Sequence, residues 1–135
     1  MSEPRELRGR KIAGGRAVGQ VLLSTAPISF FGGVDPETGT VCEPGHPLEG
    51  RCVAGRVLAF PSGKGSTVGS YTLYRMVKRG CGPVAVLNAQ CETIVAVGAI
   101  IAMIPCLDRV ALAELVDGAR VEVDADRGLV RLLED

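Results

Sequence analysis

The pattern of hydrophobic and polar positions divides the chain into an irregular, β-rich first part and a second part in which strands and helices alternate. From Arg8 to Phe31, short apolar runs are broken by glycines, which is typical of short strands joined by tight turns. Farther along, apolar runs of strand length are followed by segments with helical periodicity. We predict strands over Val53–Phe60, Val84–Asn88 and Ile104–Leu107, and helices over Ser66–Arg79 and Glu92–Met103. This alternation favours parallel β/α pairing in an α/β domain.

The two predicted helices have different patterns. In the first, Gly69, Leu73, Met76 and Val77 share one face, so we expect this face to be buried, with Gly69 at a close backbone contact. The basic residues of this helix fall on its other faces. The second helix is apolar on all sides, which predicts a central, buried helix.

The connecting segments also carry recognisable patterns. Alternating residues over Ala119–Asp124 and Gly128–Leu133 flank an Asp-Arg-Gly turn, which predicts a β-hairpin. The segments Gly32–Gly39 and Glu43–Gly50 are rich in glycine and proline, which predicts two exposed loops. We consider both loops as candidates for contact with another molecule.

A glycine-rich turn, Gly63-Lys64-Gly65-Ser66-Thr67, joins a predicted strand to the first predicted helix. The first N–H groups of a helix have no intrahelical partner, so this turn is a candidate site for an anion or a developing oxyanion. The pattern argues against a nucleotide-binding P-loop, because that motif requires a further glycine at the position of Leu58 and Ser or Thr at the position of Gly65.

Each polar residue of this turn also has a structural explanation. A serine at the start of a helix commonly caps it by accepting an N–H bond, so Ser66 alone does not establish a site. Lys64 is equally compatible with a solvated charge or with contact to an anion. The excess of glycine on both sides of Ser66 favours a ligand, because a cap does not require Gly63, Gly65 and Gly69 whereas close approach to the backbone does.

Several other polar residues point to structure rather than chemistry. His46 lies between two prolines in a polar loop, and we expect it to be exposed and without a catalytic partner. Asp35 is expected to bond its own turn, and Glu92 to serve the N-terminus of the second helix. The five cysteines include no C-x-x-C pair, and we expect them to be small buried hydrophobic residues rather than metal ligands or disulfide partners.

Composition limits the possible partners and the location of the protein. The 135 residues, nearly half of them hydrophobic, suffice for one domain with a core, so we treat residues 1–135 as a single domain. Fifteen basic and fifteen acidic residues cancel without forming runs, which argues against nucleic acid and an anionic membrane as partners. No apolar stretch reaches the roughly 20 residues of a membrane span. Residues 1–11 are charged and unlike a secretory signal, so we expect a cytoplasmic protein.

Three longer motifs occur in order along the chain. They are SFFGGVDPETG at residues 29–39, GKGSTVGSY at residues 63–71, and ETIVAVGAI at residues 92–100 followed by Ile104-Pro105. In this order they resemble the small subunit of the aconitase X family, and the resemblance extends from about Lys11 to Leu133. It implies an aconitase-type swivelling β/β/α domain with a β-rich N-terminal half and a small parallel β/α core.

The resemblance also implies a chemistry and a partner. It implies a hydro-lyase of the archaeal modified mevalonate pathway that dehydrates (R)-5-phosphomevalonate to trans-anhydromevalonate 5-phosphate. The family's catalytic base, the serine after Gly-Lys-Gly, corresponds to Ser66, and we assign substrate binding to Lys64, Gly65 and Thr67. The chain is expected to bind no cofactor itself, and a separate large subunit, in a heterodimer or a larger assembly, is expected to carry an iron–sulfur cluster.

Three alternatives follow from the same residues. A dehydratase of cis-3-hydroxy-L-proline would share the fold and Ser66, and nothing in the chain identifies a phosphate pocket. A non-catalytic swivel or docking subunit would use the glycine-rich turn only for contact. A phosphohistidine domain of phosphoenolpyruvate-dependent phosphotransferases shares some features, but residues 88–92 contain no histidine to be phosphorylated.

Overall fold

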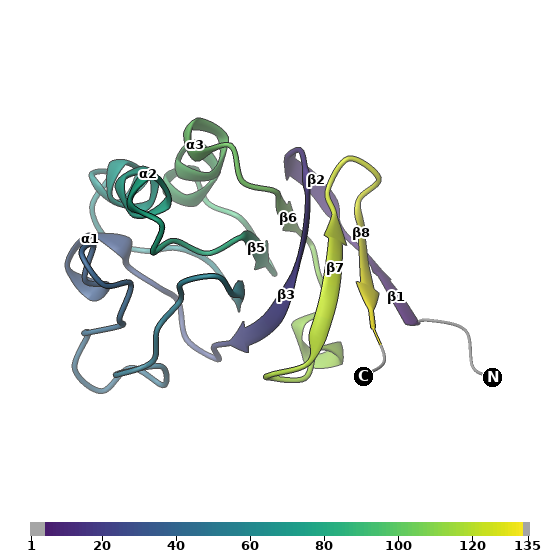
Figure 1. The fold of residues 1–135 in the computed structure, drawn as a ribbon, viewed down its shortest axis with the longest axis horizontal. Helices are drawn as coiled ribbons and strands as arrows, with labels where there is room; N and C mark the ends of the chain where they lie inside the picture. Colours follow the sequence, from purple (N-terminus) through teal and green to yellow (C-terminus); the bar gives the residue numbers. More distant parts are fainter. Residues whose placement is uncertain (1–4, 134–135) are drawn as a thin grey trace.

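Eight strands form one sheet, and the N-terminal segment supplies the strands at both of its ends (Figure 1). The computed structural model describes residues 5–133, so the first four residues of the charged N-terminal segment lie outside the described part. The strands are β1 Arg5–Arg8, β2 Arg10–Ala13, β3 Arg16–Leu23, β4 Val57–Phe60, β5 Ala85–Asn88, β6 Cys106–Asp108, β7 Arg120–Asp124 and β8 Leu129–Leu132. The helices are α1 Phe30–Gly33, α2 Gly69–Arg79 and α3 Thr93–Ala102, with a 3-10 turn, η1, at Leu112–Glu114.

The strand order is β1-β8-β7-β3-β4-β5-β6-β2, and β3 joins its two halves. The first part of β3 pairs antiparallel with β7, while Val21–Leu23 pair parallel with β4. Strands β3 to β6 are all parallel, and β7 and β8 form the expected hairpin, so both predictions are confirmed. Only Gly9 separates β1 from β2, which occupy opposite ends of the order, so this segment closes the sheet into a barrel.

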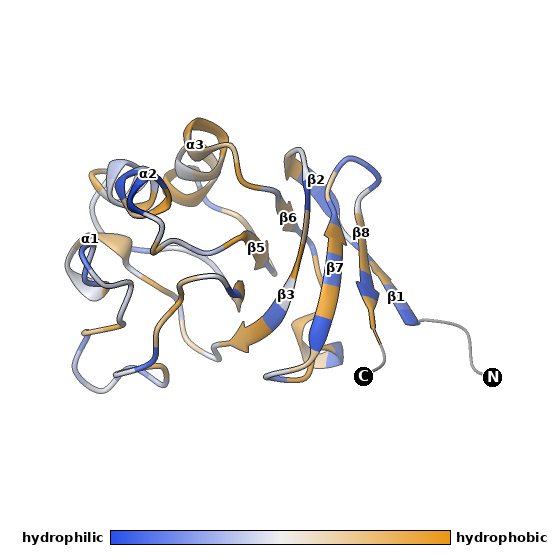
Figure 2. Cartoon of the chain, viewed as in Figure 1, coloured by the Kyte–Doolittle hydropathy of each residue, from blue (hydrophilic) through white to orange (hydrophobic). Residues whose placement is uncertain are grey.

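Successive side chains of the parallel strands point alternately into two separate hydrophobic cores. In β4, Val57 and Ala59 belong to the barrel interior, whereas Leu58 and Phe60 belong to the core beneath the helices. All four residues of β4, and all four of β5, are buried, which explains why both strands are almost continuously apolar (Figure 2). The observed architecture is the predicted α/β fold with a parallel β/α core.

Helix α2 packs against the sheet and α3 through the stripe that its sequence predicts. Gly69, Leu73 and Met76 are buried, and a Cβ on Gly69 would lie only 3.1 Å from the Ile94 side chain of α3. The Ser70 hydroxyl donates a 2.7 Å hydrogen bond to the Ile94 carbonyl, so the N-terminal ends of α2 and α3 are held side by side. Gly80 ends α2 in the left-handed conformation.

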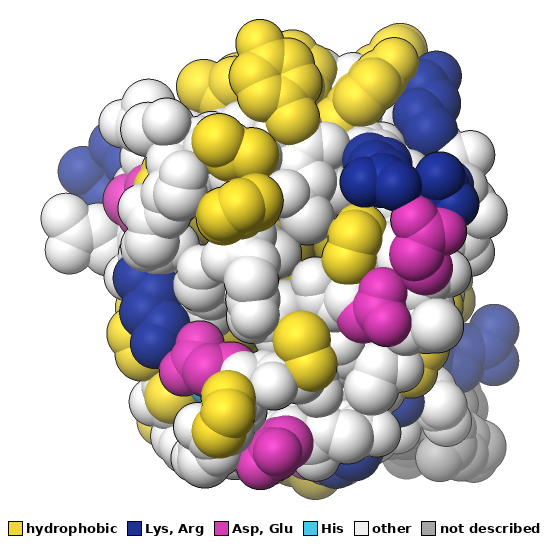
Figure 3. Space-filling model, turned by 90° about the vertical axis from the view of Figure 1, so that its left-hand side faces the viewer, with side chains coloured by type: hydrophobic (Ala, Val, Ile, Leu, Met, Phe, Trp, Pro, Cys, Tyr) yellow, Lys and Arg dark blue, Asp and Glu magenta, His cyan; other side chains and the backbone are white. Residues whose placement is uncertain are grey.

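Helix α3 is not buried on all sides, and that prediction was wrong. Val95, Gly98, Ala99 and Ala102 face the core, but other apolar side chains of α3 face outward (Figure 3). At Gly98 the helix lies so close to α2 that an added Cβ would touch Leu73 at 3.0 Å, so a larger residue does not fit at this position. No helix in the part of the chain that the structure describes has the length and apolar character needed to cross a membrane.

The segment between α1 and β4 is folded onto the core rather than extended into solvent. Its residues Val34, Val41 and Leu48 are buried in the core. Val34 and Leu48 fall within the two predicted loops, so the prediction of exposed loops was wrong for these two residues. Isolated bridges join Val34 to Val41 and Thr40 to Cys52. The Asp35 carboxylate accepts the Glu37 N–H at 2.8 Å, as its turn sequence predicts.

Candidate functional site

Three loops that follow the carboxyl ends of the parallel strands meet around the glycine-rich turn. The turn follows β4, and its Gly63 forms a parallel bridge with Ile28 in the loop after β3. Ile28 N–H donates to the Ser62 carbonyl at 3.2 Å, and Lys64 N–H donates to the Ile28 carbonyl at 3.0 Å. On the other side, Pro61 O accepts two N–H groups from the loop after β5. The carboxyl edge of such a sheet is where α/β proteins commonly bind ligands.

Ser66 lies in a turn before α2 and not at the first helical residue. The helix begins at Gly69, so the prediction of a helix from Ser66 was wrong by three residues. The difference arises because the Ser66 hydroxyl accepts the Val68 N–H at 3.2 Å and its carbonyl accepts the Gly69 N–H at 2.9 Å, which closes a separate turn. The hydroxyl therefore accepts a backbone bond, as a cap does, but ahead of the helix.

Unpaired N–H groups lie in this turn rather than in the first turn of α2. Ser70 N–H and Tyr71 N–H bond the carbonyls of Thr67 and Val68, so the start of the helix is satisfied. Within residues 5–133, by contrast, the N–H groups of Gly65, Ser66 and Thr67 donate no hydrogen bond. All three residues are exposed. Three consecutive free donors beside a serine hydroxyl form a surface that can bind an anion.

Lys64 points toward a carboxylate that sequence reasoning did not identify. Its ammonium group donates to Glu43 at 2.9 Å, which ties the turn to the loop after α1. Both side chains are at least partly exposed, so the pair contributes little to stability and either partner is free to exchange for a ligand. The assignment of Lys64, Gly65 and Thr67 to substrate binding stays a prediction.

Two glycines of the turn allow it to approach its neighbours closely. A Cβ on Gly63 would overlap the Glu92 carboxylate, and a Cβ on Gly65 would overlap the Ser29 hydroxyl. Glu92 caps α3 as predicted, because its carboxylate accepts the N–H groups of Ile94 and Val95, each at 2.8 Å. The turn is therefore wedged between the loop after β3 and the N-terminus of α3, which positions Ser66.

Asp108 anchors the loop that leads into α3. Its buried carboxylate accepts two bonds of 2.8 Å from Arg10 and one of 3.1 Å from the Cys91 N–H. Burial alone would raise the pKa of Asp108, but the bonds from Arg10 and Cys91, with the charge of Arg10, lower its pKa below the ordinary value. The neighbouring Cys106 thiol lowers the pKa of Cys91, whereas the Cys91 thiol and burial raise the pKa of Cys106.

The lowered pKa of Asp108 predicts how stability depends on pH. A carboxyl group whose pKa is lower in the folded state stabilises the fold above its unfolded pKa of about 3.9, and this contribution is lost as pH falls through the folded pKa. We expect Asp108→Asn to unfold more easily at pH 7 and to lose less stability than the wild type between pH 7 and pH 3. Urea unfolding at both pH values measures this, with Asp126→Asn, at an exposed position, as the matched control. An unchanged pH dependence in Asp108→Asn would contradict it.

His46 is buried, so the prediction of an exposed loop histidine was wrong. Its Nε2 atom donates to the Pro27 carbonyl at 2.9 Å, and its Nδ1 atom accepts the Leu48 N–H at 3.0 Å. Both ring nitrogens are therefore used in holding the 43–50 loop against the segment before Ile28. The sequence around His46 did not indicate its burial, because its hydrogen-bond partners are backbone groups, which any residue type supplies. His46 therefore has a structural role, because both of its hydrogen bonds join backbone groups of these two segments.

The cysteines are dispersed over the molecule. Cys106 is buried and Cys81 and Cys91 are half-buried, but Cys42 and Cys52 are exposed, so the expectation of buried thiols was wrong for these two. Their neighbours Val41 and Val53 point into the core, so these two side chains face outward, and each thiol donates to a nearby carbonyl. Among residues 5–133 no group of three or more His, Cys, Asp or Glu side chains is placed to hold a metal ion. The described residues thus do not fit an iron–sulfur cluster.

Comparisons with known proteins agree over nearly the whole chain. Residues 6–132 match the model of the aconitase X swivel domain. The chain is 52% identical over 130 residues to the phosphomevalonate dehydratase small subunit of Thermococcus kodakarensis, covering 96% of this chain and 98% of that protein. It is 53% identical over 129 residues to the protein of the same name from Methanothrix thermoacetophila, covering 94% of each.

A solved structure shows the same fold. The holo-form crystal structure of Thermococcus kodakaraensis aconitase X contains a chain that superimposes with a TM-score of 0.94 at 51% sequence identity. The match covers 96% of this chain and 99% of that one.

Proposed function

Because the chain belongs to the aconitase X swivel-domain family, we propose that it is the small subunit of a dehydratase that acts on (R)-5-phosphomevalonate. The observation that carries the proposal is the identity of about half of all residues, over nearly full length, to small subunits of that name. The product would be trans-anhydromevalonate 5-phosphate. The enzyme would be completed by a separate large subunit.

Dehydration of this substrate poses two chemical problems, and the chain offers a group for one of them. A proton must leave C2, which is only weakly acidic although it adjoins a carboxylate, and the C3 hydroxyl must depart. Ser66 is proposed to accept the C2 proton as an alkoxide. The iron–sulfur cluster assigned to the large subunit would supply Lewis-acid assistance to the leaving hydroxyl.

The turn supports a Ser66 alkoxide only in part. The Val68 N–H bond at 3.2 Å favours the charged form, as would any of the free N–H groups that reach it. Each unit of pKa lowering requires about 1.4 kcal/mol of differential stabilisation, whereas a helix terminus contributes about 0.3–1 kcal/mol. Since Ser66 lies three residues before α2, the helix contributes less here than at its first turn. Most of the stabilisation must come from other groups.

The exposure of the turn indicates where that stabilisation comes from. Lys64, Gly65, Ser66, Thr67 and Val68 are all exposed in this chain. Electrostatic stabilisation of a charged reactant is strong only in a site from which water is excluded. The proposed large subunit would close the site over the turn, and this is why we expect the isolated chain to be inactive.

The proposal is tested by assaying both subunits together, anaerobically and with a reconstituted cluster. We expect loss of water from 5-phosphomevalonate, no reaction with cis-3-hydroxy-L-proline, and no activity of this chain alone. Nuclear magnetic resonance of the reaction mixture identifies the product in each case. Activity only on the amino acid would contradict the substrate assignment, and full activity of the large subunit alone would contradict the catalytic role.

A further inference from the structure

Six exposed hydrophobic side chains lie on the surface that extends from the turn after Ser66 over the outer faces of α2 and α3, and we call them the patch. Nine large hydrophobic side chains are exposed among residues 5–133, and the patch contains six of them: Phe31, Val68, Tyr71, Val97, Ile100 and Ile101. They come from α1, from the turn before α2, and from the outer faces of α2 and α3. Hydrophobic side chains gather in the upper part of the face that carries these helices (Figure 3). Apolar patches of this kind mark interaction surfaces.

The surface of the patch is not flat, because it contains a ridge and two grooves. Tyr71, 69% exposed, lies between two grooves. The groove toward α3 has a volume of about 260 Å³ and is lined by Val68, Ile94 and Val97. The groove toward α1 has a volume of about 430 Å³ and is lined by Phe31, Val34 and Pro36 among others. A ridge with a groove on each side suits interdigitation with a protein surface better than contact with a flat one.

We propose that this patch is the docking surface for the large subunit. The inference rests on the proposed function, which places the reacting atoms between Ser66 and that subunit. Val68 belongs to both the turn and the patch, and its N–H donates to the Ser66 hydroxyl. A partner that covers Ser66 therefore meets Val68, which is one edge of the patch. A second copy of this chain in the same place would bury the Ser66 turn of both copies and block the site.

The charges around the patch fit an apolar partner surface. Glu37 is paired with Arg75 at 2.7 Å and also with Arg79, and Lys64 is paired with Glu43 at 2.9 Å. These charges around the patch thus largely neutralise one another and form no run of like charge that would attract a charged partner over a distance. We expect the assembly to depend only weakly on salt, since screening acts on exposed charges and not on apolar contacts.

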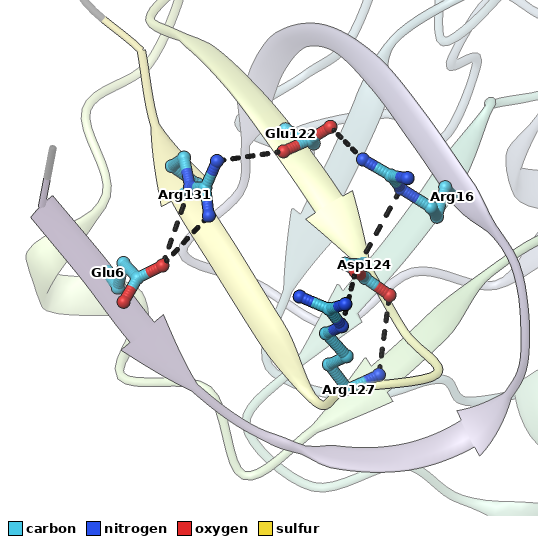
Figure 4. A network of polar contacts seen from close by, with 6 residues as sticks. All are labelled: Glu6, Arg16, Glu122, Asp124, Arg127 and Arg131. Atoms are coloured by element: carbon cyan, nitrogen blue, oxygen red, sulfur yellow. Dashed lines mark hydrogen bonds and ion pairs between the residues drawn. The ribbon is translucent and has the colours of Figure 1, made fainter.

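The outer face of the antiparallel half of the barrel is a poor alternative. Six charged side chains form a continuous network there: Glu6, Arg131, Glu122, Arg16, Asp124 and Arg127 (Figure 4). Three cations and three anions satisfy one another across β1, β8, β7 and β3. Covering them would cost desolvation without providing new pairs, so this face does not favour a dry interface.

The test measures binding of the purified chain to the purified large subunit without substrate. Tyr71→Glu and Val97→Glu each place a charge in the patch at an exposed position, so the fold is preserved. We expect each to weaken binding at least about tenfold, as loss of a central interface residue does. Val116→Glu is the matched control, because Val116 is 63% exposed in the segment before β7 and outside the patch. It should change the dissociation constant less than about twofold.

Unchanged thermal unfolding of the three variants would show that binding is measured on folded chains. Wild-type affinity of both patch variants, or an equal loss with Val116→Glu, would overturn the docking surface. So would a homodimer through the patch, seen by sedimentation, that persists when the large subunit is added. Because binding is measured without turnover, a failure of the docking surface can be distinguished from a failure of the proposed function. An inactive Ser66→Ala complex, together with patch variants that bind the large subunit normally, would refute only the docking surface.

Discussion

Replacement of Ser66 by alanine is expected to lower the turnover number of the assembled enzyme by at least about 10³-fold, within the range attributed to a general base. The hydroxyl is exposed and contacts only the Val68 N–H among the described residues, so its loss removes one weak backbone bond. The fold should therefore remain stable. Steady-state kinetics of the reconstituted complex, with unchanged affinity between the subunits, measures the effect on chemistry alone.

Ser62→Ala is the matched control for this prediction. Ser62 belongs to the same segment, but its hydroxyl makes only a long contact of 3.4 Å to the neighbouring Gly63 carbonyl. We expect its turnover to remain within about threefold of wild type, as for a change away from a special contact. A Ser66→Ala enzyme that works at near-normal rate would show that the base lies elsewhere.

Gly65→Ala is expected to lower turnover by about 10²-fold, the loss that a displacement of about 1 Å can cause at a reacting centre. Gly65 has φ +91°, a conformation that costs an L-residue roughly 1–2 kcal/mol. In addition, the new Cβ would overlap the Ser29 hydroxyl, so the turn must shift. Kinetics of the reconstituted complex, compared with its thermal unfolding, separates the displacement of Ser66 from loss of stability.

Gly50→Ala separates backbone strain from the collision with Ser29. Gly50 has φ +85°, close to that of Gly65, but nothing lies within 4 Å of a Cβ at this position. It should lose similar stability and keep wild-type turnover. Equal activity of the Gly65→Ala and Gly50→Ala enzymes would mean that the approach of the turn to Ser29 does not position Ser66.

The parts of the fold that follow from local pattern could be predicted from the sequence. The buried strands β4 and β5, the stripe on α2 and the hairpin β7–β8 are encoded by periodicity and turn residues close together in the chain. Glu92 was identified as the residue that serves α3, because a cap acts on residues only two and three positions ahead. Closure of the barrel was not predicted, since it depends on β1 and β2 pairing with distant strands.

The site could be located but not built from the sequence. The excess of glycine drew attention to the turn, and two of its glycines do lie against Glu92 and Ser29. Their partners, the pairing of Lys64 with Glu43, and the burial of His46 arise from contacts between distant segments, which carry no local signal. The start of α2 was misplaced because Ser66 bonds its own turn. The outward face of α3 was missed because apolar composition alone does not distinguish a core from an interface.

The most direct test of the account is whether Ser66 carries the proton to and from C2. Hydration of trans-anhydromevalonate 5-phosphate in heavy water by the assembled enzyme should place one deuterium on C2 of 5-phosphomevalonate, detected by nuclear magnetic resonance. We expect this incorporation with the wild-type chain and its loss with Ser66→Ala, while the variant complex still assembles. Deuterium incorporation by the Ser66→Ala complex at the wild-type rate would contradict it and place the base on the large subunit.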